Sequence, residues 1–252
     1  MMWIFLALGV LAAGAVLSLL ASQRHAVGLA IGLAAAGIGG LLSVIGGWSV
    51  LHSASVMPVT VDWPLPLGAA RFSIDGLSAW FLLIIGTVSV AAATYSWGYL
   101  KGGAAHGPVG AYGPLICTMI AAMVLTVSAA NVVLFLVGWE LMSLSAFFLV
   151  GFHDEDTSAR HGAWIYLIAT HLGTALGVLP VFAAFVARTG SMEMNTFAGA
   201  FGASETTVCV ALFVLGVVGF GTKAGFMPFH TWLPRAHPAA PAHISGLVRS
   251  RR

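Results

Sequence analysis

The sequence has very little charge. Only ten of its 252 residues are Lys or Arg and eight are Asp or Glu, so 7% are charged, against roughly 25% in an ordinary soluble domain. So low a share excludes a water-soluble globule. The net charge of +2 comes from scattered groups and a short arginine tail, with no basic stripe of the kind that follows a phosphate backbone. We therefore expect no nucleic-acid partner.

Cysteine and the common catalytic motifs are also scarce. The two cysteines, Cys117 and Cys209, lie far apart in apolar runs and lack the spacing of a metal knuckle or a disulfide framework, so we expect both to pack as small hydrophobes. His230, His237 and His243 are separated by seven and six positions with prolines between them, which matches no compact zinc site. Redox cysteine pairs, nucleophile elbows and dinucleotide fingerprints are missing. The sequence predicts no metal site, no cofactor and no catalytic centre in this chain.

Apolar residues and glycine dominate instead. Apolar residues make up 59% of the chain, the mean hydropathy is +0.98 and there are 31 glycines, which is typical of an all-α bundle of transmembrane helices. A bilayer crossing takes about 20 apolar residues. Seven spans are therefore predicted, near residues 2–21, 26–51, 76–98, 112–130, 131–152, 162–187 and 207–232.

The basic residues of the loops give the orientation of the chain. Four fall in loops on one side and two on the other, and the more positive side faces the cytoplasm. This predicts an N-terminus outside the membrane and places the longest connection, residues 52–75, on the outer face, where a structured loop can form. The basic residues are Arg24, Lys101, Arg160 and Arg235 on the first side, and Arg71 and Arg188 on the second.

The seventh span is irregular. Glycines surround Lys223 and prolines follow it, at Gly216, Gly219, Gly221, Gly225, Pro228 and Pro234. This pattern predicts a broken helix. Unwound backbone at membrane depth is tolerated only where it is buried in protein or lines a hydrated cavity, as in the ion sites of many transporters.

Three ionisable residues, Glu140, His171 and Lys223, fall inside the predicted spans. A charge at the centre of a membrane helix costs roughly 2.5–3.5 kcal/mol on insertion scales, so each needs a functional or structural reason. A carboxyl group and an amine at low dielectric couple their proton affinities, and His titrates in a range suited to a relay. This favours proton transfer. The structural alternatives are a neutral, hydrogen-bonded Glu140, a Lys223 that reaches the interface, and a His171 that only packs.

Three motifs resemble one known family. The run from Lys223 to Pro241, KAGFMPFHTWLPRAHPAAP, resembles the seventh-helix signature of the proton-conducting, antiporter-like subunits of respiratory complex I, multisubunit cation/proton antiporters and group 4 hydrogenases. Residues 138–143 (GWELMS) resemble its fifth-helix motif, and residues 72–81 (FSIDGLSAWF) the segment entering its third helix. The Lys223 region, with His243 beyond it, is most similar to component B of hydrogenase-4 and the corresponding membrane component of formate hydrogenlyase, and next to complex I.

The resemblance implies that Glu140 and Lys223 are the fifth- and seventh-helix pair of a proton channel. We expect His171, from its position and titration range, to link them through water. The resemblance also implies that electron-transfer cofactors reside in partner membrane and peripheral subunits of a hydrogenase or complex I-like assembly in the inner membrane. The helix break and the loop after it would be formed by the remaining motif residues, which are Gly221, Gly225, Pro228, His230, Trp232, Pro234, His237 and Pro241.

The chain departs from this family in length. Family members resemble one another over about fourteen helices in two inverted repeats, whereas residues 1–252 form one transmembrane domain whose residues 112–246 resemble an incomplete first repeat. We expect a truncated product or one part of a split gene, with a flank that exposes Glu140 or Lys223 to lipid and lowers stability in isolation. The alternative functions are a non-conducting structural or assembly role and membership of a cation/proton antiporter.

Overall fold

The computed structural model describes residues 1–53, 58–63, 69–101, 109–152 and 156–239. Within these residues, seven segments are long and apolar enough to cross a membrane. The predicted all-α architecture with seven spans is therefore confirmed. The first five spans are the helices α1 (Met2–Leu20), α2 (His25–Ser53), α3 (Gly76–Lys101), α4 (Val109–Ser128) and α5 (Val132–Val150).

The sixth and seventh spans are each built from several elements. The sixth consists of α6 (Thr157–Gly173), a π-helical turn (Thr174–Val178) and α7 (Leu179–Thr189). The seventh consists of α8 (Thr206–Ala224), a 3₁₀ turn (Phe229–Trp232) and α9 (Leu233–Ala239). The break predicted in the seventh span is confirmed. The π-helical turn was not predicted. It lies just before Pro180, which has no backbone N–H to continue the α-helical hydrogen bonding.

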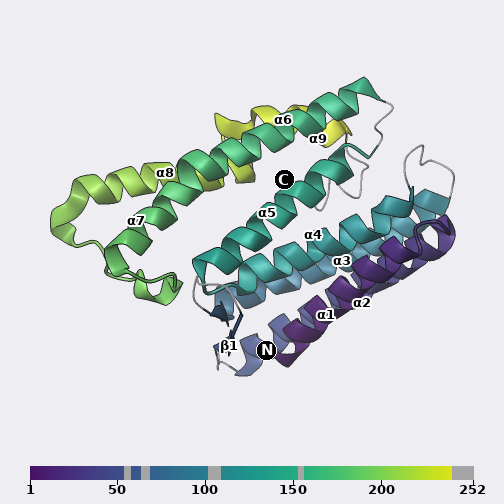
Figure 1. Cartoon of the computed structure of the whole chain (residues 1–252), viewed down its shortest axis with the longest axis horizontal. Helices are drawn as coiled ribbons and strands as arrows, with labels where there is room; N and C mark the ends of the chain where they lie inside the picture. Colours follow the sequence, from purple (N-terminus) through teal and green to yellow (C-terminus); the bar gives the residue numbers. More distant parts are fainter. Residues whose placement is uncertain (54–57, 64–68, 102–108, 153–155, 240–252) are drawn as a thin grey trace.

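Helices α1 to α4 pack side by side as one bundle, with α5 lying between this bundle and α6 to α9 (Figure 1). Glycine allows the close approach of α2 and α4, because a Cβ atom on Gly32 would lie 2.4 Å from Gly113 Cα. The core of the bundle contains Leu11, Ile116 and Ile120, none of which is exposed. Small residues at helix crossings are the usual means by which membrane helices bring their backbones together.

Short strands close one end of the bundle. The strands β1 (Val59–Val61) and β2 (Ala70–Phe72) form an antiparallel pair in the 52–75 connection, for which a structured loop was predicted. Isolated bridges join Phe72 to Ala129 and Asn131 to Glu193, so the α4–α5 connection lies between the 52–75 connection and the α7–α8 connection. An ion pair of 3.1 Å between Arg71 and Glu193 joins the two outer members of these three segments.

Capping side chains determine the residue at which two of the helices, α5 and α6, begin. The sixth span begins at Thr157 and not at the predicted residue 162. The Asp156 carboxylate caps the helix there by accepting the Ser158 N–H at 2.8 Å. Arg160 therefore lies in the first helical turn and not in a loop. The predicted division at 129–131 is present. Its cause is Asn131, whose side chain accepts the Val133 N–H at 2.8 Å and starts α5.

Exposed Trp and Tyr side chains lie towards both ends of the helix bundle. Trp48 and Trp80 are more than half exposed near the strand end of the bundle, and Tyr95 and Trp164 are as exposed near the other end. On α3, Trp80 and Trp97 are separated by about 25 Å at 1.5 Å per residue, close to the hydrocarbon thickness of a bilayer. Rings of Trp and Tyr are typical of the membrane–water interface.

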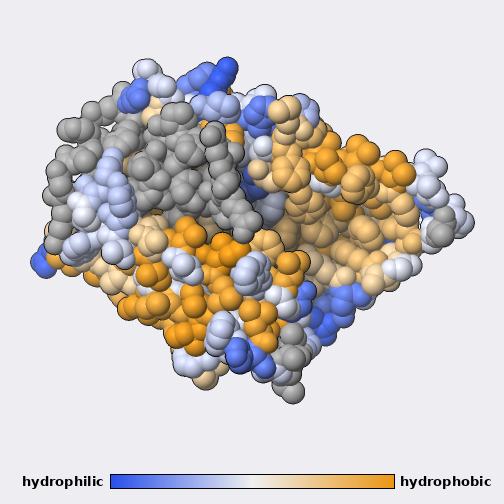
Figure 2. All heavy atoms as spheres, turned by 180° about the vertical axis from the view of Figure 1, so that it is seen from behind, coloured by the Kyte–Doolittle hydropathy of each residue, from blue (hydrophilic) through white to orange (hydrophobic). Residues whose placement is uncertain are grey.

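The α7–α8 hairpin projects from the rest of the molecule (Figure 1). The structure describes every residue of α7, and none of them is buried. On α8, Phe213 and Val210 are 72% and 55% exposed. Figure 2 shows that this projecting part, at the right of the view, has a largely apolar surface.

Candidate functional site

Glu140 lies at the middle of α5, as the ninth of its 19 residues. Its carboxylate Oε2 is 3.1 Å from Nε2 of His171 on α6. His171 also lies near the middle of its span, which runs from Thr157 to Thr189. Two of the three intramembrane ionisable residues found in the sequence are therefore in direct contact.

The second nitrogen of His171 fixes how protons are placed in this contact. Nδ1 lies 3.0 Å from the carbonyl oxygen of Leu167, which only accepts hydrogen bonds, so Nδ1 carries a proton. The Nε2–Oε2 contact then holds one further proton, either on His171 as an imidazolium or on Glu140 as a carboxylic acid. The two groups come from different helices and lie close enough to share a hydrogen bond.

Lys223 lies in the last turn of α8. Gly225, with φ of +73°, ends the helix; its N–H bonds to the carbonyl of Thr222, and the N–H of Phe226 bonds to that of Gly221 at 2.9 Å. This is the Schellman arrangement, which favours glycine at the left-handed position. The break therefore places the Lys223 ammonium at the negative end of a helix dipole inside the membrane, where a cation is favoured.

The Lys223 side chain contacts α5. Nζ donates a short hydrogen bond to Oγ of Ser143 and lies 4.9 Å from the centroid of the Trp139 ring, a cation–π contact. Although the structure describes both Lys223 and Glu140, no ion pair joins them directly. Trp139 and Ser143 lie one residue before and three residues after Glu140, so Lys223 contacts α5 at the level of Glu140.

Trp139 connects α5 with the π-helical turn of the sixth span. Its indole N–H donates to Oγ1 of Thr174 at 3.0 Å, and Thr174 in turn donates to the carbonyl of Thr170 at 3.0 Å. Gly177 in the same turn lies against Gly219 of α8, where an added Cβ would be 2.4 Å from Gly219 Cα. This contact fixes α8, and with it Lys223, against the span that carries His171.

Trp232, which is 2% exposed, packs the 3₁₀ turn Phe229–Trp232 against the C-terminal end of α8. Its indole N–H donates to the Thr222 carbonyl at 2.8 Å, and its ring packs edge-on against Tyr166 at 5.1 Å. His230 lies in the same 3₁₀ turn; its Nδ1 is buried and has no hydrogen-bond partner among the described residues. Of the other predicted loop residues, Pro228 precedes this turn, Pro234 and His237 lie in α9, and Pro241 is outside the described residues.

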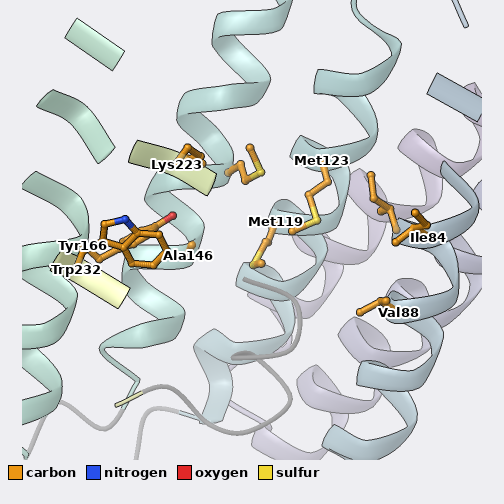
Figure 3. Close-up of a pocket in the computed structure, with 10 residues that line it drawn as sticks. Ile84, Val88, Met119, Met123, Ala146, Tyr166, Lys223 and Trp232 are labelled. Carbon is orange, nitrogen blue, oxygen red and sulfur yellow. The ribbon is translucent and has the colours of Figure 1, made fainter. Parts of the chain in front are cut away.

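A pocket of about 220 Å³ lies beside Lys223 (Figure 3). Its walls come from α3, α4, α5, α6 and the seventh span, and most of its lining side chains are apolar. The lining residues are Ile84, Ile85, Val88, Met119, Met123, Met142, Ala146, Tyr166, Lys223 and Trp232.

Glu140 and His171 remain partly accessible on the surface of this chain. Their side chains are 33% and 44% exposed, although both lie at mid-membrane depth. A polar pair that faced lipid there would be costly.

Sequence reasoning identified the ionisable residues but not their partners on α5. Ser143 and Trp139 were visible only as polar and aromatic members of an apolar span, and Thr174 as a neighbour of His171. Polar side chains within one or two turns of a charged residue are the signal that identifies such partners in a membrane helix.

Two family models match the chain. The model described as "NADH:quinone oxidoreductase/Mrp antiporter, TM" matches residues 129–250. The model described as "NADH-Ubiquinone oxidoreductase (complex I), chain 5 N-terminus" matches residues 69–106. Together they cover the third helix and all the spans that carry Glu140, His171 and Lys223.

Curated relatives come from several kinds of complex. Hydrogenase-4 component B of Escherichia coli K12 is 34% identical over 211 residues, which are 84% of this chain and 31% of that protein. A probable K(+)/H(+) antiporter subunit of Rhizobium meliloti is 30% identical over 214 residues, 83% of this chain and 21% of that protein. The matched region covers about a third of the hydrogenase-4 component and about a fifth of the antiporter subunit.

Two solved structures share the fold. A chain of the archaeal membrane-bound sulfane sulfur reductase matches with a TM-score of 0.82 at 18% identity, over 96% of this chain and 49% of that one. A chain of the Mrp complex from Dietzia matches with a TM-score of 0.81 at 26% identity, over 97% of this chain and 26% of that one.

Proposed function

We propose that this chain, which belongs to the antiporter-like family of membrane subunits found in NADH:quinone oxidoreductases, Mrp antiporters and hydrogenase-4, moves protons. It would do so within a hydrogenase-4-like or complex I-like assembly. The observation that carries the proposal is the 3.1 Å contact between Glu140 and His171 at mid-membrane depth. A carboxyl group and an imidazole that share one proton can take it up and pass it on without leaving a bare charge in hydrocarbon.

Lys223 is the group that responds to the proton of this pair. Its amine contacts Ser143 and Trp139, on either side of Glu140 in α5, and within the described residues no ion pair joins it to the Glu140 carboxylate. A proton leaving the Glu140–His171 pair adds a negative charge, which favours the charged form of Lys223; a proton arriving has the opposite effect. Ser143 and Trp139 hold the amine in place while its charge changes.

The remaining expectations belong to the same proposal. The chain acts as the first repeat of a longer antiporter-like unit, beside other membrane and peripheral subunits that carry the electron-transfer cofactors. The membrane is the cell inner membrane, with the N-terminus and the strand end of the bundle on the outer side. The partly exposed Glu140–His171 pair supports a covering partner, because a polar pair facing lipid at this depth is costly.

The test is Glu140→Gln in inverted membrane vesicles that contain the whole assembly. Proton uptake is followed with a pH-sensitive dye during electron transfer, and we expect it to fall at least about tenfold, because Gln cannot carry the proton. The matched control is Glu205→Gln, which makes the same change at a carboxylate of the α7–α8 connection that pairs with Arg188 at 3.1 Å. Proton uptake unaffected by Glu140→Gln would refute the proposal and favour a structural role in assembly.

A second candidate is a role in cation/proton antiport, favoured by the similarity to the probable K(+)/H(+) antiporter subunit of Rhizobium meliloti. The same vesicles distinguish the two. An antiporter releases protons when K⁺ or Na⁺ is added without an electron donor, whereas a redox-driven subunit moves protons only during electron transfer.

A further inference from the structure

We propose that the pocket beside Lys223 is a binding site for a small amphipathic carboxylate, whose head group pairs with Lys223 and whose apolar tail lies among the methionines of α4 and α5. The pocket shares Lys223 with the proposed proton-transfer site but extends from it into an apolar space that proton transfer does not use. The Glu140–His171 contact is not among its lining residues.

The lining favours an apolar tail. Met119 and Met123 from α4 and Met142 from α5 line the pocket together with branched side chains of α3 (Figure 3). Methionine side chains are unbranched and polarizable, so they adapt to ligands of different shape. Most of these walls offer few hydrogen-bond partners, so they favour an apolar tail.

Lys223 favours an anionic head group. It is the one basic side chain among the lining residues. An ammonium has three N–H donors, and within the described residues Ser143 is the one hydrogen-bond acceptor for Nζ. The other donors lie at the edge of an apolar space where water gives little compensation, and unpaired donors of a buried charge are costly. A carboxylate supplies both the charge and the acceptors.

The volume limits the size of the ligand. The pocket of about 220 Å³ is larger than the roughly 150 Å³ of a cavity that holds benzene. It is smaller than the roughly 300 Å³ at which pockets for drug-sized ligands begin. A carboxylate of about ten non-hydrogen atoms, such as octanoate, fits these limits.

The experiment uses the full chain in detergent and an octanoate analogue with a photoreactive diazirine on its tail. After irradiation, we expect labelled peptides to contain Met119, Met123 or Met142. Excess octanoate should compete and excess octanamide should not, because the amide has the same tail without the charge. The site is measured by binding alone, so the result is independent of whether Glu140 and Lys223 transfer protons.

Three variants test the two halves of the site. Lys223→Gln removes the cation and should lower labelling about tenfold or more, since charge-assisted hydrogen bonds are the strong ones. Ala146→Leu keeps Lys223 and fills the pocket from α5, where Ala146 is 2% exposed, and should abolish labelling. Val137→Leu adds bulk on the exposed side of α5 and should leave labelling unchanged.

Any of three results would overturn the proposal. The labelling could spread over lipid-facing peptides, octanamide could displace the probe as well as octanoate does, or the labelling could survive in both Lys223→Gln and Ala146→Leu. Each result would mean that the probe partitions into the micelle and does not bind beside Lys223. Monodisperse elution of both variants is required, so that a loss of labelling is not a loss of fold.

Discussion

The contact between the π-helical turn and α8 gives a sharp test of what positions Lys223. In Gly177→Ala, the new Cβ would lie 2.4 Å from both Cα and N of Gly219 and 2.6 Å from the Leu215 carbonyl oxygen. Ordinary contacts of a Cβ atom lie at 3.4–4 Å. Because the opposing atoms are backbone, no side chain can rotate away, and α8 must move by about 1 Å from the sixth span.

The matched control is Gly216→Ala on α8, where an added Cβ has nothing within 4 Å. Both substitutions gain the helix propensity of alanine, about 1 kcal/mol, so the difference between the variants isolates the steric cost. Overpacking of this kind costs about 1–3 kcal/mol. We therefore expect Gly177→Ala to be less stable than Gly216→Ala by that amount.

The free energy of unfolding would be measured for both variants by SDS titration in mixed micelles. Proton uptake in vesicles gives a second readout, because moving α8 also moves Lys223 from Ser143 and Trp139. Equal free energies of unfolding in the two variants would show that the Gly177–Gly219 crossing is not the constraint that holds α8.

Two further predictions concern the strand end of the bundle. Arg71→Glu should lower the free energy of unfolding by about 1–2 kcal/mol, between the values for exposed and buried ion pairs. Adding Glu193→Arg should restore part of the lost stability. Additive losses in this double-mutant cycle would contradict a direct Arg71–Glu193 interaction. Asp75 precedes α3, and the hydrogen bond from the Ser78 backbone N–H, at 2.7 Å, lowers the pKa of its carboxyl group despite partial burial. Because the folded pKa is below the unfolded one, this stabilisation is present above about pH 4 and is lost as pH falls through the folded pKa. Asp75→Ala should therefore cost about 1 kcal/mol at pH 7 and clearly less at pH 3, and unfolding titrations that give the same cost at both pH values would argue against the cap.

Several features of the fold follow from local sequence. The seven spans follow from the length of the apolar runs, since each crossing satisfies its backbone within one helix. The end of α8 follows from Gly225 and Pro228, because a left-handed residue and a missing N–H stop a helix wherever it lies. The start of α6 was placed too late, since Asp156 looked like part of an acidic loop until its side chain was seen to cap the helix.

Hydropathy alone predicts which ionisable groups fall inside the apolar spans, because the cost of a buried charge is a property of one segment at a time. The contacts of these groups come from the packing of the helices: His171 meets Glu140, Lys223 bonds to Ser143 beside the Trp139 ring, and a pocket lies next to Lys223. These contacts depend on how each helix is rotated and how closely it crosses its neighbours. Such crossings are set by pairs such as Gly177 and Gly219, which are far apart in the sequence and whose meeting no local pattern encodes.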